Sequence, residues 1–101
     1  MPTYEFMTNL AGSAMYTVLF ITSQGRVRGF IVRLRAQLDG CWYEVRRYDT
    51  AHGTPHVDVL NWRGTTIEKV WLPQLTPPDA LTFAIEDIKA NYETYIRRFI
   101  A

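Results

Sequence analysis

The chain has 101 residues, of which 48% are hydrophobic and 14% aromatic, and its formal net charge is +1. This length suits a single domain over residues 1–101 with one hydrophobic core, and the apolar content excludes an intrinsically disordered protein. No apolar run approaches the roughly twenty residues of a membrane-spanning helix, and the N-terminus lacks the basic start of an export signal. We therefore expect a cytoplasmic protein with no membrane partner. The lone cysteine, Cys41, lies in an apolar run, which predicts a packed core residue.

Positive charge is concentrated in one quarter of the chain. Residues 24–48 carry six arginines but only two carboxylates, Asp39 and Glu44. The arginines are Arg26, Arg28, Arg33, Arg35, Arg46 and Arg47. Such a distribution favours an arginine-rich sheet surface, which is either a platform for RNA or a solvated face without a ligand.

Five strands are predicted between residues 14 and 72. Residues 1–13 show no clear period, and we expect a loop or a loosely attached segment there. Runs rich in β-branched and aromatic residues follow at 14–22, 30–37, 41–48, 56–62 and 66–72, and each junction contains a glycine. Because these connections are too short to hold a crossover helix, the strands should form an antiparallel meander.

Alternation along the strands predicts which side chains share a face. Over residues 30–37 every second position is apolar, so Arg33 and Arg35 should emerge together on the opposite face. On the next strand, alternation places Glu44, Arg46 and Tyr48 on one face and Arg47 on the other. The three tryptophans are expected in core or edge packing, although one exposed beside the arginines would stack on a base.

The C-terminal segment changes to the period of a helix. Pro73, Pro77 and Pro78 end the sheet, and apolar residues then recur at three- and four-residue steps over residues 78–100. Thr76 is a start signal for this helix, and Asp79 suits the positive end of its dipole. The fold class is therefore α+β, with a five-stranded antiparallel meander packed against one long C-terminal helix.

The segment from Tyr48 to Asp58 contains both histidines of the chain, His52 and His56. His56 and Asp58 are two residues apart on a predicted strand and should share a face, and the bend between the histidines could return His52 toward them. An aspartate that bonds one imidazole nitrogen fixes the tautomer and prepares the ring for proton transfer. Arg46, one strand over, could then hold a phosphate.

This arrangement points to metal-independent RNA cleavage. Attack by the RNA's own 2′-hydroxyl needs a base, an acid and a cation near the phosphate, but no cofactor. A metal site of His52, His56 and Asp58 is the alternative chemistry, and we expect no metal because no recognised ligand motif is present. The third interpretation is an ordinary polar hairpin, in which Asp49 bonds the following backbone and Gly53 supplies positive φ.

The order of residues 46–56, followed by Lys69-Val70-Trp71-Leu72 and a terminal helix, resembles the TumE-like toxins of prokaryotic toxin–antitoxin pairs. Those toxins are regarded as distant relatives of the RelE-type ribosome-dependent ribonucleases. The resemblance implies a small antiparallel sheet with helical packing, activity on RNA and a cognate antitoxin as partner. The motif residues it implies are Arg47, Tyr48, Asp49, His52 and His56.

Two functions follow as hypotheses. The first is a toxin-like, RNA-acting protein without a cofactor, in which His52, His56 and Asp58 are catalytic. The residues expected to bind its substrate are Arg33, Arg35, Arg46, Arg47 and Tyr48. The second is a noncatalytic interaction module that forms a homodimer through an open edge of the sheet, because an unpaired edge strand invites pairing.

Overall fold

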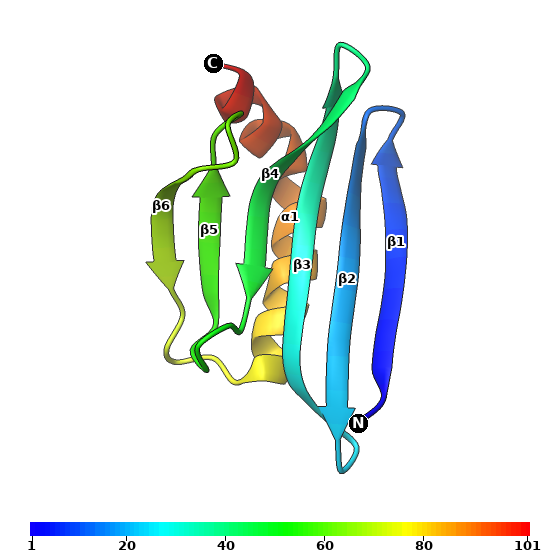
Figure 1. Cartoon of the computed structure of the whole chain (residues 1–101), viewed down its shortest axis with the longest axis vertical. Coiled ribbons are helices and arrows are strands. Elements are labelled where there is room, and N and C mark those ends of the chain that lie inside the picture. The colour runs from blue at the N-terminus through cyan, green and yellow to red at the C-terminus, as the bar shows by residue number, and fades with distance from the viewer.

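The computed structural model describes all 101 residues as one antiparallel sheet with a helix on one of its faces (Figure 1). The sheet has six strands, and each strand pairs with the next along the chain. The strands are β1 (Thr3–Ala11), β2 (Ala14–Ser23), β3 (Arg26–Leu38), β4 (Cys41–Asp49), β5 (His56–Leu60) and β6 (Thr66–Trp71). The helix is α1 (Pro77–Ile100). The α+β class, the meander and the C-terminal helix are thus confirmed.

The strand β1 is a correction to the five-stranded prediction. Residues 3–11, expected as a loop, pair with β2 over its whole length, so the sheet begins at Thr3 rather than at Ala14. The sequence pattern is weak here because β1 is an edge strand in which only Thr8 and Leu10 are half-buried and the other residues are exposed. Alternation between half-buried and exposed positions, the usual signal for a strand, is confined to the last four residues of β1.

The core lies between α1 and the centre of the sheet. Thr76 caps the helix by accepting a hydrogen bond from the Asp79 backbone N–H at 3.3 Å, as the sequence predicts. Ala80, Ala84 and Ile88 on α1 are fully buried against Val32 and Leu34 of β3 and their neighbours. Small alanines bring the helix axis close to the strands, which is why the first half of α1 carries the tightest packing.

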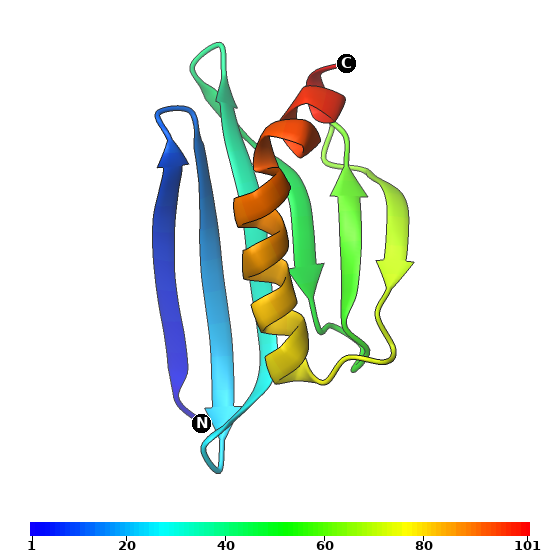
Figure 2. The ribbon, with the colours of Figure 1, turned by 180° about the vertical axis from the view of Figure 1, so that it is seen from behind.

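The helix covers only part of one sheet face, and the other face has no covering element. Figure 2 shows α1 running over β3 and β4, with β1 and β2 to one side of it and β5 and β6 to the other. We call the uncovered side the open face. In the register of the sheet it carries Arg33 and Arg35, whereas Val32 and Leu34 point toward the helix, as the alternation predicts.

An irregularity in β4 changes the predicted faces of that strand. Arg35 pairs with Glu44 but Leu34 pairs with Arg46, so Val45 is an extra residue in a β-bulge. Because of this residue, Glu44 and Arg46 lie on opposite faces instead of sharing one. Glu44 joins Arg47 on the open face, and Arg46 and Tyr48 point toward the helix.

Three smaller expectations are also corrected. Cys41 is exposed at the start of β4 rather than packed in the core. Trp42 and Trp62 are 43% and 64% exposed rather than packed, whereas Trp71, 47% exposed on the edge strand β6, packs against His56 as expected for edge packing. The fourth predicted strand ends at Leu60, because the Asn61 side chain accepts hydrogen bonds from the backbone N–H groups of residues 63 and 65 and closes a turn there. No helix is long and apolar enough to cross a membrane.

Candidate functional site on the open face

Two rows of side chains cross the open face. The charged row follows the register Arg33, Arg47, Asp58 and Lys69 across β3, β4, β5 and β6. Beside it, the histidine row follows Ile31, Asp49, His56 and Trp71 across the same four strands. With strands about 4.8 Å apart, each row is about 14 Å long. Antiparallel pairing thus gathers residues from four strands into one polar surface.

His56 is held at both ring nitrogens. Its Nδ1 donates to the Thr54 carbonyl oxygen at 3.0 Å, and its Nε2 is 3.0 Å from Asp49 Oδ1 and 3.6 Å from Asp58 Oδ2. The ring is only 2% exposed, and the Trp71 ring lies against it with centroids 5.0 Å apart. Since the Thr54 contact uses the Nδ1 proton, the short contact with Asp49 needs a second proton between Nε2 and Oδ1.

The turn before β5 sets this geometry. Asp49 Oδ1 accepts a hydrogen bond from the Ala51 backbone N–H at 2.9 Å, and the Gly53 N–H donates to the Thr50 carbonyl oxygen at 2.9 Å. His52 and Gly53 have positive φ, +66° and +89°, which lets the chain reverse within a few residues. As a result β5 starts at His56, directly opposite Asp49. The hairpin interpretation is correct for the backbone, and Asp49 has a second role toward His56.

Arg47 is the common cation of the carboxylates on this face. Its Nε is 3.6 Å from Asp49 Oδ2 and 3.7 Å from Asp58 Oδ2, and its Nη1 is 3.7 Å from Glu44 Oε1. Lys69 Nζ lies 3.6 Å from Asp58 Oδ1 on the far side. Asp49 and Asp58 are 6% and 5% exposed, so this charge pairing takes place largely out of water.

Arg33 and Arg35 differ in their ionic contacts. Arg33 Nε is 3.3 Å from Glu44 Oε1, so Glu44 serves both Arg33 and Arg47. Arg35 has no carboxylate within 4.0 Å, and its Nε is buried without a hydrogen-bond partner. Arg35 is therefore the arginine of this face whose charge is left uncompensated.

Three of the expected site residues lie apart from His56. His52 is exposed in the turn and makes none of the polar contacts of His56. Arg46 and Tyr48 lie under α1, where Arg46 Nε donates to the Tyr48 hydroxyl at 3.0 Å and that hydroxyl donates to Asp87 at 2.6 Å. The structure therefore brings together His56, Asp58, Arg47 and Arg33, and separates them from His52, Arg46 and Tyr48.

The hydroxyl groups around Asp87 have altered acidity. Burial raises the pKa of Tyr48 well above its usual value near 10, and the hydrogen bond to Asp87 adds to this because a carboxylate disfavours a phenolate beside it. Burial and the same carboxylate also raise the pKa of Tyr95. Both phenols therefore stay protonated as hydrogen-bond donors to Asp87.

Asp49, His56 and Asp58 also have the geometry of a metal site. One ligand atom from each lies within 4.8 Å of the others, and the carbonyl of Thr54 orients the imidazole so that Nε2 faces the carboxylates. However, Arg47 and Lys69 already lie against these oxygens. A divalent cation would add to two positive charges in a largely buried place, so the residues fit a salt-bridge network better than a metal ion.

The local sequence does not predict the roles of several residues in this site. From the sequence, Asp49 is expected to be a turn residue and a motif residue of the resemblance, and Asp58 is expected to be the partner of His56. In the structure, Asp49 makes the shorter contact with His56. Glu44 reaches this face only through the bulge, and Lys69 and Trp71 reach it through the register of β6. Glu44 belongs to no motif, and Lys69 and Trp71 appear only in the segment Lys69-Val70-Trp71-Leu72 of the resemblance, which gives them no role at this site.

The fold and the site together define a class: a small α+β protein whose single helix covers one face of an antiparallel meander and whose other face carries a histidine–carboxylate–arginine network. One family model matches residues 1–101, and the chain belongs to that family, the domain of unknown function DUF7718. Searches of curated proteins and of solved structures each found no match.

Proposed function

We propose that this protein is a toxin-like, RNA-acting protein that binds RNA across the open face of its sheet. The observation that carries the proposal is Arg35, an arginine on this face without an ionic partner, which lies beside the charged row on the side away from the histidine row. An uncompensated guanidinium on a rigid strand is suited to a phosphate, because it forms two parallel charge-assisted hydrogen bonds without first breaking an ion pair.

The aromatic side of the same face supports this proposal. Trp71 is 47% exposed at the end of the histidine row, and Lys69 Nζ lies 5.2 Å from the centroid of its ring. A tryptophan next to basic side chains suits a single-stranded nucleic acid, whose bases stack on the ring while its phosphates meet the cations. Arg35 lies on β3 beside the charged row, and Trp71 lies on β6 at the far end of the histidine row. An RNA strand that contacts both would cross the face obliquely.

Cleavage is the second step of the proposal. Attack of the 2′-hydroxyl on the adjacent phosphorus forms a 2′,3′-cyclic phosphate and releases the 5′-oxygen, so one group must accept a proton and another must supply one. The proposal assigns proton supply to His56, whose Nε2 lies 3.0 Å from Asp49 Oδ1, and proton acceptance to His52 in the exposed turn. His56 is covered by Trp71, so the tryptophan must leave the ring when RNA binds.

Binding and cleavage are tested separately. Fluorescence anisotropy with a single-stranded RNA oligonucleotide should show salt-dependent binding, and Arg35→Gln should weaken it several-fold and lower the salt slope by about one. Arg26→Gln is the matched control, because Arg26 is exposed at the start of β3 and outside both rows. Total RNA with EDTA, with and without translating ribosomes, then reports cleavage by the wild type and by a folded His56→Gln variant.

The two assays have distinct negative outcomes. Absence of binding at low salt, or equal losses in Arg35→Gln and Arg26→Gln, would overturn the open face as an RNA platform. Binding without cleavage under any condition, or equal cleavage by His56→Gln, would remove His56 from the chemistry and leave a binding protein. EDTA-resistant cleavage that disappears in His56→Gln is the expected result.

A second candidate function is a homodimer through the β1 edge. This nine-residue strand has only one charged residue, Glu5, and no proline or lysine to block pairing. It also exposes Tyr4, Phe6 and Met7, at 49%, 44% and 61%. Two copies of β1 joined in antiparallel fashion would pair the free backbone edge of each sheet and cover part of these side chains.

A further inference from the structure

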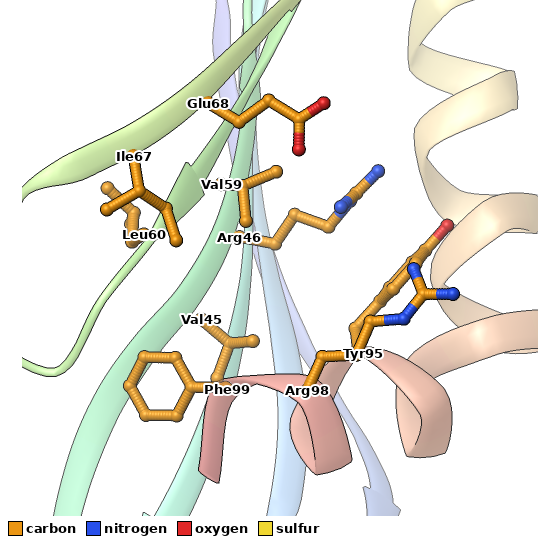
Figure 3. A pocket seen from close by; sticks show the side chains of 9 residues that line it. All are labelled: Val45, Arg46, Val59, Leu60, Ile67, Glu68, Tyr95, Arg98 and Phe99. Carbon is orange, nitrogen blue, oxygen red and sulfur yellow. The ribbon is translucent and has the colours of Figure 1, made fainter. Parts of the chain in front are cut away.

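A pocket of about 230 Å³ lies on the helix side of the sheet, between β4–β6 and the last turns of α1 (Figure 3). Its apolar wall is formed by Val45, Val59, Leu60, Ile67 and Phe99. The pocket exists because α1 runs over β3 and β4 and leaves β5 and β6 without a cover on this side (Figure 2). It is separate from the open face, which lies on the other side of the sheet.

Arg46 provides a fixed cation at this pocket. Its Nε donates to the Tyr48 hydroxyl at 3.0 Å, and its guanidinium carbon is 3.9 Å from the centroid of the Tyr95 ring. The side chain is 16% exposed, so it is largely enclosed but not sealed from the pocket. Stacking and hydrogen bonding hold the guanidinium in one orientation before any ligand arrives, which lowers the entropic cost of binding.

The charge of Arg46 is only partly compensated. The nearest carboxylate oxygen, Asp87 Oδ2, is 3.9 Å from its Nη2. That carboxylate already accepts hydrogen bonds from the hydroxyls of Tyr48 and Tyr95 and from the amide of Asn91. A guanidinium has five N–H donors, and those of Arg46 that do not bond Tyr48 thus have no strong acceptor.

A second cation stands at the same end of the pocket. Figure 3 shows the guanidinium of Arg98 beside the Tyr95 ring, on the same side as that of Arg46, with Ile67 and Leu60 across from them. Arg98 is exposed and has no carboxylate within 4.0 Å. Glu68 is the one acidic residue of the lining, so the charged side chains sum to a single positive charge.

We propose that this pocket binds a small organic monoanion, a carboxylate attached to a compact apolar group. The carboxylate would lie between Arg46 and Arg98, and the apolar group would lie against Ile67, Leu60 and Phe99. Glu68 opposes a second negative charge, which favours a monocarboxylate over a phosphate dianion. The volume is below the roughly 300–1,000 Å³ of pockets for drug-sized ligands, so the ligand is small.

The test is an NMR titration of the full chain with phenylacetate, followed by the same titration with phenylacetamide, its neutral isostere. Phenylacetate should give saturable amide shifts at Val59, Leu60 and Ile67, and phenylacetamide should bind more weakly. Arg98→Gln should weaken phenylacetate binding about two- to fivefold, as expected for an exposed ionic contact. Arg97→Gln is the matched control, since Arg97 is exposed on the same helical turn but does not line this pocket.

Four outcomes would overturn the proposal: no saturable shift, equal binding of acid and amide, shifts confined to residues outside the pocket, or equal effects of the two arginine variants. The RNA assays use the opposite face, so their result is independent of this one. Selective binding of the acid with loss only in Arg98→Gln would establish the site.

Discussion

Asp49 and His56 face each other across β4 and β5, with the carboxylate Oδ1 3.0 Å from the imidazole Nε2. The two residues also delimit the turn that reverses the chain between these strands, so one contact closes the hairpin and fixes the histidine. Both are more than nine-tenths buried. This contact therefore stabilises the fold whether or not a substrate binds. Replacing either residue should affect both the hairpin and the position of the histidine.

Replacing Asp49 should destabilise the protein substantially. Asp49→Asn removes the charge that faces His56 and Arg47. Its remaining oxygen can keep the contacts of Oδ1 with Ala51 and His56, but an amide NH₂ replaces Oδ2 and turns a donor toward Arg47. We expect a loss of about 2 kcal/mol in the free energy of unfolding, because a buried charge-assisted hydrogen bond and an ion pair are weakened together. Urea denaturation followed by circular dichroism measures this change.

Asp39→Asn is the control for that experiment. Asp39 lies in the exposed β3–β4 turn at a φ of +51°, a conformation that asparagine tolerates well. This variant should keep the wild-type denaturation midpoint. Should Asp49→Asn also keep it, the contact with His56 contributes nothing to stability, and its geometry would need a purely functional explanation.

Arg47 and Asp58 should be energetically coupled. Arg47→Met leaves two buried carboxylates without their shared cation, and we expect a loss of about 2–3 kcal/mol. In an Asp58→Asn background Asp49 is the only buried aspartate that loses Arg47, so the same replacement should cost about 1 kcal/mol less. A double-mutant cycle in urea measures the difference. Strictly additive effects would show that Arg47 does not act through Asp58.

Local sequence patterns explain most of the fold. The alternation of residues 30–37 matches the buried and half-exposed sides of β3, and the three- and four-residue steps of residues 78–100 match α1. These patterns are readable because each element buries one side. The strand β1 buries little of either side, and the bulge at Val45 depends on how β3 and β4 align, so neither leaves a clear periodic signal.

The sequence predicts only those parts of the candidate site whose residues are close together along the chain. His56, Asp58 and Arg47 share a face through short spacings, and a reader of the sequence can place them together. Lys69 and Trp71 join them through the pairing of β5 with β6, and Glu44 joins them because a single extra residue in β4 reverses the parity. A one-residue change of register moves a side chain to the other face, and local patterns do not determine it.

Tyr48 should make stability fall at alkaline pH. Its pKa is raised in the folded protein, mainly by burial and then by Asp87, whereas an unfolded tyrosine ionises near pH 10. The folded state therefore binds more protons above pH 10, so this contribution is complete below that pH and is lost as pH rises further. Urea midpoints measured from pH 8 to pH 12 should decline above pH 10.

Tyr48→Phe separates this effect from general alkaline unfolding. At pH 8 the variant should be about 1–2 kcal/mol less stable, since Asp87 loses a hydrogen bond at 2.6 Å. Above pH 10 its stability should decline less steeply than that of the wild type, so the gap between the two proteins narrows. The difference in stability between wild type and Tyr95→Phe should narrow less above pH 10, because the Tyr95 phenol is more exposed. Parallel curves for wild type and Tyr48→Phe would contradict the assignment.

The β1 edge predicts self-association that a single charge can prevent. Met7 lies at the middle of β1, is 61% exposed and makes no core contact, so Met7→Lys should leave the monomer folded. In a dimer with antiparallel β1 strands, two such lysines would meet near the two-fold axis, where like charges repel and their desolvation is costly. Sedimentation equilibrium should show a concentration-dependent dimer for the wild type and at least a tenfold weaker dimer for the variant.

Gln24→Lys is the matched control, because it adds the same charge in the exposed β2–β3 turn, away from the edge. It should dimerise as the wild type does. That result would show that Met7→Lys weakens the dimer because of its position on β1 and not because of the added net charge. Equal weakening by both lysines would mean that charge alone controls association. A wild-type chain that stays monomeric at the highest accessible concentration would eliminate the edge-paired dimer, and the exposed aromatic side chains of β1 would then need another partner.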